Sequence, residues 1–468
     1  MIFLNLQNSL SKVGFLLSES VEYKKKWYRI KMPSYTLFLY LKIKEKKMKF
    51  QYEKEYDNVF DELKDRGYFE AATDEEELAE KLKNEKLTFY CGFDATADSL
   101  TVGHLIQIMV MMRMQNYGHR PIALLGGGTT MIGDPSGRSD MRMVMTKEKI
   151  NHNANCFYKQ FQRFLEFENE GEDSGDKAII ENNANWLLNL PFIDFLRDVG
   201  SNFLVNEMLK KDAYKNRMDK GLTFFEFSYM LLQSYDFLEL FRRHNCTLEI
   251  GGSDQWSNII GGYDLIRKKE DAKVYGMTFK LLTTADGVKM GKSQKGAVWL
   301  DEEKTSAYEL FQYMRNVDDR DVEKFLLMLT FLPTAECRKL GNGKDAKEIN
   351  HAKEVLAYEI TKLIHGEEKA KEALEASKAL FSGAGDESAM PTTEIEKEEF
   401  PMGILTLLTK LGLTKSNSQA RDSVKGGGVS INDEKITDPR FEINEDLFED
   451  GKIIVKKGKK TFHKVTIK

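Results

Sequence analysis

The sequence predicts an α/β protein whose largest domain is a doubly wound, Rossmann-like parallel sheet. Three observations support this fold class. Residues 87–125 read as strand, helix and strand, which is the βαβ unit of parallel sheets. A long apolar helix and a second, glycine-ended strand follow within 221–256. The 468-residue chain has 41% hydrophobic and 31% charged residues, which is the balance of a globular protein with two or three domains.

The βαβ unit begins with "LTFYCGFD" at residue 87, an apolar and aromatic run typical of a buried strand. Apolar residues then recur at helical spacing from Leu105 to Met112, and Gly118 ends the helix. The next run, "PIALLGGG", predicts a short buried strand that enters a glycine turn. Ligands of such sheets bind at the carboxyl ends of the strands, so we expect a polar rim there. The residues expected on this rim are Asp94, Thr96, Thr101, His104 and Asp134.

Residues 221–245 predict a helix that is apolar nearly all round and therefore buried. Tyr229, Gln233 and Asp236 nevertheless share one face of it, because they are spaced as i, i+4 and i+7. Polar side chains on a buried face need hydrogen-bond partners. The stripe is therefore either a satisfied internal network or the wall of a pocket for a small polar ligand, and we favour the pocket.

Two glycine-containing segments follow this helix. Residues 246–256, "CTLEIGGSDQW", predict a strand that ends at two glycines, where a ligand can approach the backbone closely. Residues 281–296 predict a polar loop. Its ammonium groups can stabilise charge that develops on a leaving polyphosphate, although basic loops are usually just solvated. The polar residues that we single out in the two segments are Asp254, Gln255, Lys289, Lys292 and Ser293.

The remaining chain predicts two further domains. The expected catalytic domain spans 48–282, and 283–302 form a loop and linker. Residues 303–383 are charged and helical in pattern, 384–400 form a small-residue and acidic linker, and 401–468 predict a helix, a glycine turn and strands. The last segment, "GKIIVKKGKKTFHKVTIK", holds seven lysines and no acid. It indicates either a phosphate-contacting patch or a solvated terminal strand.

The N-terminal extension, residues 1–47, is expected to be disordered or a mis-called start. The residues from Lys44 to Lys47 directly precede Met48. Purine-rich codons for them would form a bacterial ribosome-binding site at the correct distance from a start codon. We therefore expect translation to begin at Met48. The intact mass of the native protein tests this expectation, because a mass that includes residues 1–47 would contradict it.

Composition argues against several other classes of protein. The net charge is −5, so any contact with nucleic acid must come from local basic patches. The longest apolar runs are shorter than 18 residues, which argues against a membrane span. The four cysteines are scattered, which fits a reducing cytoplasm. They lack zinc-site spacing and the chain has no H-E-x-x-H, so we expect no protein-held metal.

Taken together, the motifs resemble one family. T-V-G-H at 101–104 and K-M-G-K-S at 289–293 resemble the two ATP signatures of class I aminoacyl-tRNA synthetases. "YCGFDATADSL", "GDPSGRSDMR", "EFSYMLLQSYDF" and "GGSDQW" resemble the bacterial tyrosyl-tRNA synthetases. The resemblance runs from about residue 50 to the C-terminus. It implies that tyrosine attacks the α-phosphate of ATP, giving tyrosyl-adenylate and pyrophosphate, and that the tyrosyl group then passes to the 3′ end of tRNA(Tyr).

The resemblance implies a tyrosine pocket. The residues implied for the substrate phenol are Tyr90 and Asp236, and those for the ammonium group are Asp134, Tyr229 and Gln233. Those implied near the reacting carboxylate and the α-amino group are Asp94 and Gln255. A pocket that buries such hydrogen-bonding groups rejects phenylalanine, because the groups would be left unpaired, and this enzyme family is itself a known example of the effect.

The resemblance also implies an ATP site. The residues implied for the ribose and the adenylate are Cys91, Gly103, His104, Gly252, Asp254 and Lys292. Those implied for the phosphates are Thr96, Thr101, Arg138, Arg142, Lys289, Lys292 and Ser293, the two arginines on a loop that closes over pyrophosphate. Thr101 stands where the family usually has His, so it offers a hydroxyl but no imidazole. Gly291 stands where many relatives have Ser, which we expect to loosen the loop. Mg²⁺ is expected to arrive with ATP.

Further partners follow from the resemblance. The C-terminal segment resembles a small RNA-binding domain shared with a ribosomal protein, and the helical segment resembles the anticodon-arm domain of the family. The implied partners are tRNA(Tyr), L-tyrosine, ATP and a second copy of the chain, with no membrane.

Three alternatives remain open at this point. A tryptophanyl-tRNA synthetase shares the fold, but the pair of Tyr90 and Asp236 argues against it because an indole has no phenol to read. A nucleotidyltransferase that makes a small cofactor would not need the two further domains. A non-catalytic RNA-binding protein derived from a synthetase is the third. The residues that speak against lost activity are Asp134, Gln233, Asp236 and Lys292.

Overall fold

The computed structural model describes residues 52–136, 145–168, 175–215, 218–293, 296–382, 391–432, 434–448, 451–458 and 461–468. The expectations for the N-terminal extension, Arg138 and Arg142 lie outside these residues. The same holds for the side chains of Lys292 and Ser293.

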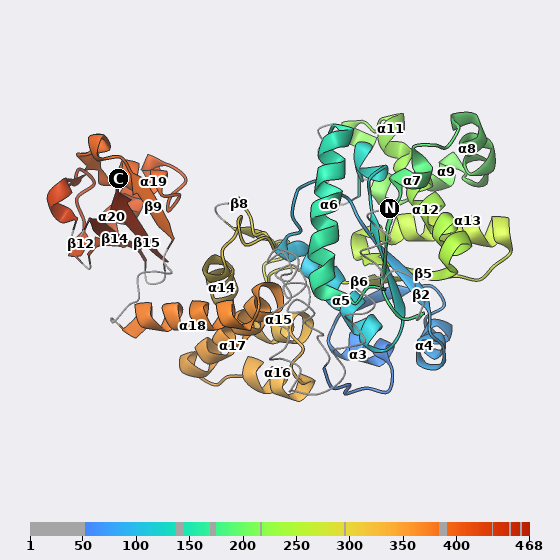
Figure 1. The fold of residues 1–468 in the computed structure, drawn as a ribbon, viewed down its shortest axis with the longest axis horizontal. Coiled ribbons are helices and arrows are strands. Elements are labelled where there is room, and N and C mark those ends of the chain that lie inside the picture. Colours follow the sequence, from blue (N-terminus) through green and yellow to red (C-terminus); the bar gives the residue numbers. More distant parts are fainter. Residues whose placement is uncertain are drawn as a thin grey trace, which may run out of the picture. The chain divides into compact units, whose positions relative to one another are not determined.

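A six-stranded sheet forms the centre of the first described part (Figure 1). Its strands are β1 (Phe69–Ala72), β2 (Thr88–Phe93), β3 (Arg120–Leu125), β4 (Ile179–Asn182), β5 (Cys246–Gly252) and β6 (Tyr275–Phe279). They lie in the order β1-β6-β5-β2-β3-β4. All neighbours are parallel except β1, which is antiparallel to β6. The strands expected at 87, 121 and 246 are β2, β3 and β5, so the predicted fold class is confirmed.

The direction of winding reverses between β2 and β5. From β2 the chain adds β3 and β4 on one side, whereas β5 and β6 lie on the other. The loops after β2 and β5 therefore diverge at the carboxyl ends of these two strands. Such a switch point is where open parallel sheets bind their ligands. The strands end there at Phe93 and Gly252.

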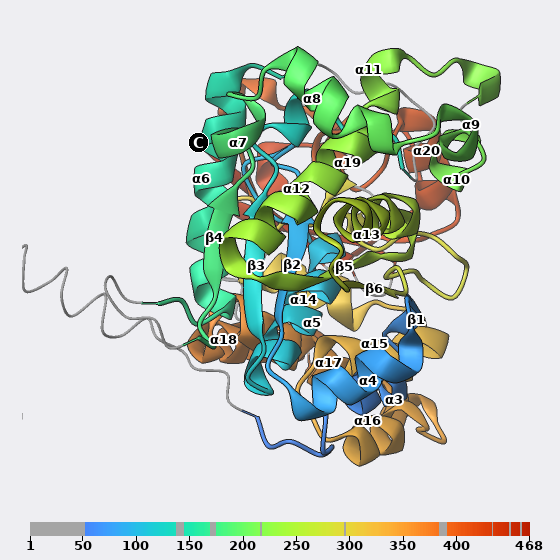
Figure 2. The same cartoon turned by 90° about the vertical axis from the view of Figure 1, so that its right-hand side faces the viewer.

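Helices cover both faces of this sheet. α5 and α6 pack on β3, while α12 and α13 pack on β5 from the opposite face (Figures 1 and 2). The helices of this part are α3 (Val59–Asp65), α4 (Glu75–Asn84), α5 (Leu105–Asn116), α6 (Lys147–Phe164), α7 (Ala184–Leu187), α8 (Phe192–Asp198), α9 (Val205–Met208), α10 (Asp212–Lys215), α11 (Phe224–Phe227), α12 (Tyr229–His244) and α13 (Trp256–Glu270). Short 3-10 turns precede α5 and α13, at η3 (Val102–His104) and η7 (Ser253–Gln255).

The single helix expected over 221–245 is divided in two. Thr223 and Glu226 form a capping box that starts α11, because each side chain accepts a hydrogen bond from the backbone N–H of the other. Ser228 separates this short turn from α12, so Tyr229 is the first residue of the longer helix. α12 ends where Asn245 adopts a left-handed conformation (φ 49°). Sequence periodicity missed the division because both pieces are apolar.

A buried ionic cluster joins α3 and α5 to the backbone at Thr330 and Leu332. Arg113 is fully buried, forms an ion pair with Glu62 and donates to the carbonyl of Thr330. Arg66 donates from Nε to Glu62 Oε1 at 2.9 Å and from Nη2 to the carbonyl of Leu332 at 2.9 Å. Buried charges are tolerated only when such partners are present, so breaking one pair is costly.

The expected helical segment is present as five helices. They are α14 (Ala307–Arg315), α15 (Val322–Leu329), α16 (Thr334–Gly341), α17 (Ala346–His365) and α18 (Glu367–Ser382). α14, α17 and α18 pack against one another. A two-stranded hairpin, β7 (Lys292–Ser293) and β8 (Gly296–Ala297), precedes them.

The C-terminal part is a small α+β unit. Its elements are β9 (Thr392–Ile395), β10 (Met402–Gly403), α19 (Ile404–Lys410), α20 (Asn417–Lys425), β11 (Val429–Ile431), β12 (Glu434–Ile436), β13 (Glu442–Ile443), β14 (Lys452–Lys457) and β15 (Thr461–Ile467). Five strands form one sheet in the order β12-β11-β14-β15-β9. The expected helix, glycine turn and strand are α20, Gly426–Gly428 and β11.

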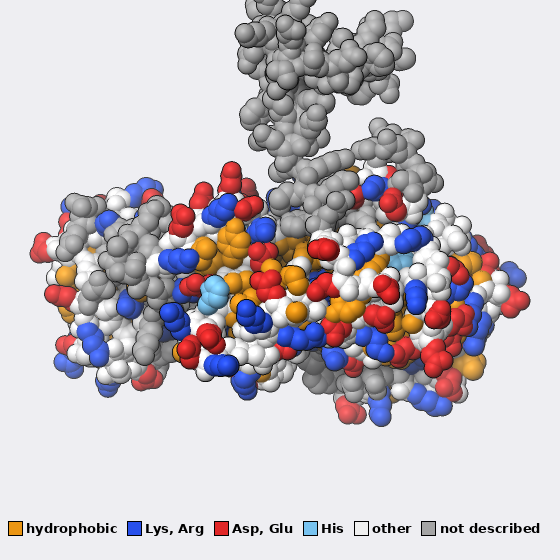
Figure 3. Space-filling model, turned by 90° about the horizontal axis from the view of Figure 1, so that it is seen from below, with side chains coloured by type: hydrophobic (Ala, Val, Ile, Leu, Met, Phe, Trp, Pro, Cys, Tyr) orange, Lys and Arg blue, Asp and Glu red, His pale blue; other side chains and the backbone are white. Residues whose placement is uncertain are grey.

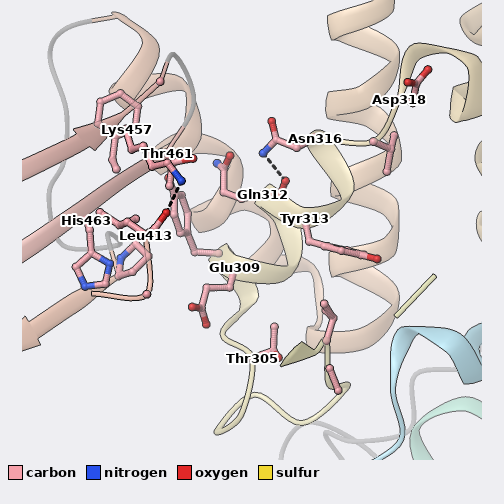
Figure 4. A pocket seen from close by; sticks show the side chains of 18 of the residues that line it. Thr305, Glu309, Gln312, Tyr313, Asn316, Asp318, Leu413, Lys457, Thr461 and His463 are labelled. Atoms are coloured by element: carbon pink, nitrogen blue, oxygen red, sulfur yellow. Dashed lines mark hydrogen bonds between the residues drawn. The ribbon is translucent and has the colours of Figure 1, made fainter. Parts of the chain in front are cut away.

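One expected boundary differs from the structure. Part of the segment 384–400, expected to be a linker, is β9, which pairs in parallel with β15. The C-terminal sheet therefore begins before residue 401, and the small-residue, acidic composition concealed a four-residue strand. Among the terminal lysines, Lys457 donates through Nζ to the carbonyl of Leu413 (Figure 4). This ammonium group is thus bonded within the domain.

The surface has mixed charge. Acidic and basic side chains are interspersed on the face that Figure 3 draws, with hydrophobic side chains in small groups between them. This distribution agrees with the small net charge of −5. Within the described ranges, every helix is too short or too polar to cross a membrane.

Candidate active site

A cavity of about 440 Å³ opens at the carboxyl ends of β2 and β5. This volume is within the usual range for a small-molecule site. The cavity brings together all the predicted site residues whose side chains the structure describes. They are Tyr90, Cys91, Asp94, Thr96, Thr101, Gly103, His104, Asp134, Tyr229, Gln233, Asp236, Gly252, Asp254, Gln255 and Lys289. The expected rim and the expected helix face therefore line one cavity.

One end of the cavity contains a fixed carboxylate and an unpartnered phenol. Asp236 is 2% exposed, and it accepts hydrogen bonds from Trp186 Nε1 at 2.7 Å and Asn183 Nδ2 at 2.8 Å. Tyr90 is 1% exposed, and its ring packs against Phe237 with the centroids 5.4 Å apart. Its hydroxyl lies beside the Glu249 carboxyl group but forms no hydrogen bond of ordinary geometry in the described part of the chain. An unpartnered buried hydroxyl is uncommon and indicates a position where a ligand can bond.

Burial raises the pKa values of the acidic groups in this region. It raises the pKa of Asp236 well above the ordinary value, although hydrogen bonds from Asn183 and Trp186 act in the opposite direction. Burial raises the pKa of Glu249, which is 1% exposed on β5, to about 7. It also raises the pKa of Tyr90, and the Glu249 carboxyl group adds to this effect. Such shifts are typical of functional sites, where charge is held out of water.

A second group of polar side chains lies where α12 faces the loop after β3. Asp134 accepts from the backbone N–H of Ser136 at 2.9 Å and from Gln255 Nε2 at 2.7 Å. Burial raises the pKa of Asp134, and the nearby Asp94 raises it further. Tyr229 donates to Asp94 Oδ2 at 3.3 Å. These contacts hold two carboxylates side by side, an arrangement that favours a bound cation.

The first signature segment is fixed by a local capping box. His104 Nδ1 accepts from the backbone N–H of Thr101 at 3.0 Å and lies 3.1 Å from its hydroxyl oxygen. An Nδ1 that accepts leaves the proton of the neutral ring on Nε2. Burial lowers the pKa of His104 to about 4, so the ring is neutral near pH 7. The ring can therefore donate one hydrogen bond into the cavity from Nε2.

The two signature segments touch through glycines. A Cβ atom on Gly291, whose φ is 102°, would lie 2.9 Å from the backbone nitrogen of Gly103. A Cβ on Gly103 would lie 3.4 Å from the carbonyl oxygen of Met290. The expected looseness of the loop at Gly291 stays a prediction, and the structure adds a steric reason for glycine at this position. This glycine is needed because the backbone has a positive φ and passes close to the first signature.

The adjoining rim carries an exposed ion pair. Lys289 Nζ lies 3.1 Å from Asp254 Oδ2, and the lysine side chain is 56% exposed. A Cβ atom on Gly252, at the end of β5, would lie 2.8 Å from the Leu281 side chain and 2.9 Å from Asp254 Oδ1. The end of β5 therefore packs too closely against Leu281 and Asp254 to accept a side chain at position 252. The Lys289 ammonium can leave Asp254 for a phosphate, because a surface pair of this kind is weak.

Three residues that shape the phenol end of the site were not predicted, namely Asn183 and Glu249, which line the cavity, and Trp186, which bonds Asp236 from behind it. Asn183 and Trp186 bond Asp236, but they follow β4, a four-residue strand without a distinct sequence pattern. Glu249 lies in the middle of β5. Glu249 could have been found as the single acid in a strand that is otherwise mostly apolar. Burying such a charge is costly, so an acid at this position indicates a partner or a function.

Comparisons with known proteins agree with this geometry. Residues 82–382 match the family described as tRNA synthetases class I (W and Y), and residues 384–465 match the tyrosine–tRNA ligase SYY-like C-terminal domain. The chain is 57% identical over 411 residues to the tyrosine–tRNA ligase of Lachnoclostridium phytofermentans, covering 87% of this chain and 98% of that one. It is 54% identical over 411 residues to that of Caldanaerobacter subterraneus, covering 88% and 100%.

A solved structure supports the same assignment. The C-terminally truncated mitochondrial tyrosyl-tRNA synthetase of Aspergillus nidulans superimposes with a TM-score of 0.61 at 30% identity, covering 70% of this chain and 95% of that one. The chain therefore belongs to the class I tRNA synthetases of the tryptophan and tyrosine group. Within this group it is a tyrosine–tRNA ligase, with ATP as a substrate.

Proposed function

We propose that the cavity at the ends of β2 and β5 is where L-tyrosine and ATP react to form tyrosyl-adenylate. The observation that carries this proposal is the unpartnered Tyr90 hydroxyl in the same cavity as the fixed Asp236 carboxylate. A substrate phenol would accept from Tyr90 and donate to Asp236, whose oxygens retain lone pairs. Phenylalanine would leave both groups unpaired, which explains rejection of that amino acid.

The ammonium group of tyrosine is proposed to bind among the acids nearer the rim. Asp134, Tyr229 and Gln233 supply oxygen atoms for it, and Asp94 lies beside them. Lys289 is the single Lys or Arg among the described residues that line the cavity. A cation in this acidic cavity would offset the mutual repulsion of the buried carboxylates. Gln255 would then lie near the reacting carboxylate.

The reaction needs no protein nucleophile. The carboxylate of tyrosine attacks the α-phosphate and pyrophosphate leaves, so the chain acts by positioning and by stabilising charge. His104 would donate from Nε2, Thr101 would offer its hydroxyl, and Lys289 would move from Asp254 to the phosphates. Mg²⁺ would arrive on the phosphates, where it commonly takes one or two carboxylates as additional ligands, and Asp254 is a carboxylate at this rim.

A homodimer is proposed from exposed apolar side chains on α8, α9 and α11. Single exposed apolar residues are ordinary, but these are large and lie on neighbouring short helices before α12. The most exposed are Phe192, Ile193, Leu204, Val205 and Phe224, each between 57% and 68% exposed. Light scattering on the eluting peak of a size-exclusion column tests this proposal, with twice the chain mass expected. The chain is further proposed to act in the cytoplasm, since its four cysteines are free.

Amino-acid-dependent exchange of labelled pyrophosphate into ATP, run with each of the twenty amino acids, tests the proposed reaction. Exchange with tyrosine alone is expected. Exchange with tryptophan would overturn the assignment of the cavity. Folded protein that binds RNA without any exchange would point to the non-catalytic alternative. Asp236→Ala is expected to abolish tyrosine discrimination while ATP binding is largely kept, and unchanged tyrosine activation would contradict the role of Asp236.

A further inference from the structure

Glu249 is a buried acid of the cavity to which no role has yet been given. Its Oε1 accepts from Gln233 Nε2 at 2.9 Å, which joins β5 to α12. Its Oε2 is buried and has no hydrogen-bond partner in the described ranges. A Cβ atom on Gly262 would lie 3.2 Å from Oε2 and 2.9 Å from the ring of Phe237, so the carboxyl group is closely packed. The Tyr90 hydroxyl lies beside it, since each of the two groups shifts the pKa of the other.

Above its raised pKa of about 7, the Glu249 carboxyl group is ionised and constrains the amide that bonds it. It can only accept, so the NH₂ group of Gln233 must face Glu249 and the amide oxygen must face away from it. In the part of the chain that the structure describes, Gln233 Oε1 has no hydrogen-bond partner, and Gln233 lines the cavity. An amide oxygen held in this orientation is an acceptor. It suits an ammonium group and does not suit a carboxylate.

We propose that Glu249 is a positioning residue for the α-ammonium group of tyrosine, acting through Gln233. It holds the Gln233 amide so that the oxygen faces the ammonium group, and it adds negative charge behind that amide. A glutamine at position 249 could offer Gln233 either its oxygen or its NH₂ group, so the same orientation would not be enforced. This inference rests on the proposed placement of the ammonium group near Gln233.

The test compares two competitive inhibitors, one that has the ammonium group but a hydroxymethyl group in place of the carboxylate, and one that has the carboxylate but no ammonium group. Tyrosinol carries the ammonium group, and 3-(4-hydroxyphenyl)propionate lacks it but keeps the phenol and the carboxylate. Each is titrated against tyrosine in the pyrophosphate-exchange assay, with wild-type protein and with Glu249→Gln. We expect Glu249→Gln to weaken the binding of tyrosinol roughly 3- to 10-fold, which is the range of one net hydrogen bond. The affinity for the propionate should not change. Equal weakening of both inhibitors, or of neither, would overturn the inference.

Two further variants separate positioning from packing. In a Gln233→Ala background, Glu249→Gln is expected to have no additional effect on tyrosinol, because the group through which it acts is gone. Glu239→Gln is the matched control, since Glu239 is a carboxylate on α12 that bonds Arg243 Nε at 2.9 Å and does not line the cavity. Glu239→Gln is expected to change the affinity for neither inhibitor. An additional loss in the Gln233→Ala background would contradict the proposed route.

The outcomes also separate this inference from the proposed function. Wild-type protein that fails to exchange with tyrosine would overturn the function itself. Wild-type exchange with an unaltered ratio of inhibitor affinities in Glu249→Gln would overturn only the role of Glu249. If Glu249→Gln does not fold, Glu249→Asp carries the same test. It keeps an acceptor-only group but withdraws it from Gln233 by one carbon–carbon bond, so the same selective loss of tyrosinol is expected.

Discussion

Tyr90→Phe removes one buried oxygen and is expected to change stability and tyrosine binding in opposite directions. In the ligand-free protein the Tyr90 hydroxyl is buried without a partner in the described residues. An unsatisfied group of this kind costs about 1–3 kcal/mol. The ring keeps its contact with Phe237 in the variant, so no cavity larger than one oxygen is left. The free energy of unfolding of the catalytic domain should therefore rise by about 1 kcal/mol or more.

The same substitution should weaken binding of the substrate. With tyrosine bound, the lost hydrogen bond to the phenol is worth about 0.5–1.5 kcal/mol, which raises the KM for tyrosine about 2- to 12-fold. The KM for ATP should not change, because Tyr90 lies at the phenol end of the cavity. Calorimetry without ligand gives the first effect, and about 2–4 °C in Tm is expected per kcal/mol for a domain of this size. Pyrophosphate exchange gives the second effect.

A matched control variant, Tyr214→Phe, should change the Tm in the opposite direction. Tyr214 is also fully buried, but its hydroxyl donates to the carbonyl of Phe227 at 2.7 Å. Tyr214→Phe should therefore lower the Tm, because it leaves a buried carbonyl with one bond fewer. A Tyr90→Phe variant whose Tm falls as that of Tyr214→Phe does, or whose KM for tyrosine is unchanged, would refute the assignment of the Tyr90 hydroxyl to the substrate.

Other parts of the structure lead to three further predictions. Arg113→Met should destabilise the protein by about 1.5–3 kcal/mol in denaturant unfolding, because it removes one of the two guanidinium groups that bond the buried Glu62 carboxylate and leaves only Arg66, and an unchanged midpoint would contradict this. The pKa of Glu249 rises from 4.5 to about 7 on folding. Its contribution to the free energy of unfolding is therefore fully present below pH 4.5 and is lost as the pH rises through 7, and the total loss is roughly 3 kcal/mol. Calorimetry from pH 5 to pH 8 should show a smaller decline in Glu249→Gln than in the wild type. Gly252→Ala would place a Cβ 2.8 Å from Leu281 and 2.9 Å from Asp254 and should raise the KM for ATP several-fold, whereas Gly403→Ala, whose Cβ meets open space outside the cavity, should not.

Local patterns predicted the central elements of the fold. β2, α5, β3 and β5 were visible because each is long enough to show a periodicity and ends at a glycine or a polar run. β1 and β4 were not visible, since four residues of mixed polarity carry no distinct period. The same limit concealed β9 in what looked like a linker.

Residues of the candidate site were predictable where the local sequence around them indicates a functional role. Asp134 and Gln255 stand in polar loops, and Asp236 is a charge on an apolar helix. The partners that fix Asp236 could not be predicted. Asn183 and Trp186 reach Asp236 because β4 lies beside β3 in the sheet. The spacing of residues along the chain does not predict which strands are neighbours.

The contact between Gly103 and Gly291 limits how this enzyme can diverge. A side chain at position 291 would have to displace the backbone of the other signature, so neither segment can be exchanged alone. A lineage that acquires Ser at position 291 must first open the distance between the two loops. A chimera that receives residues 289–293 from a serine-bearing relative therefore requires a matching transplant of 101–104. We therefore expect the two short motifs to be exchangeable only as a single unit, although they are distant along the gene.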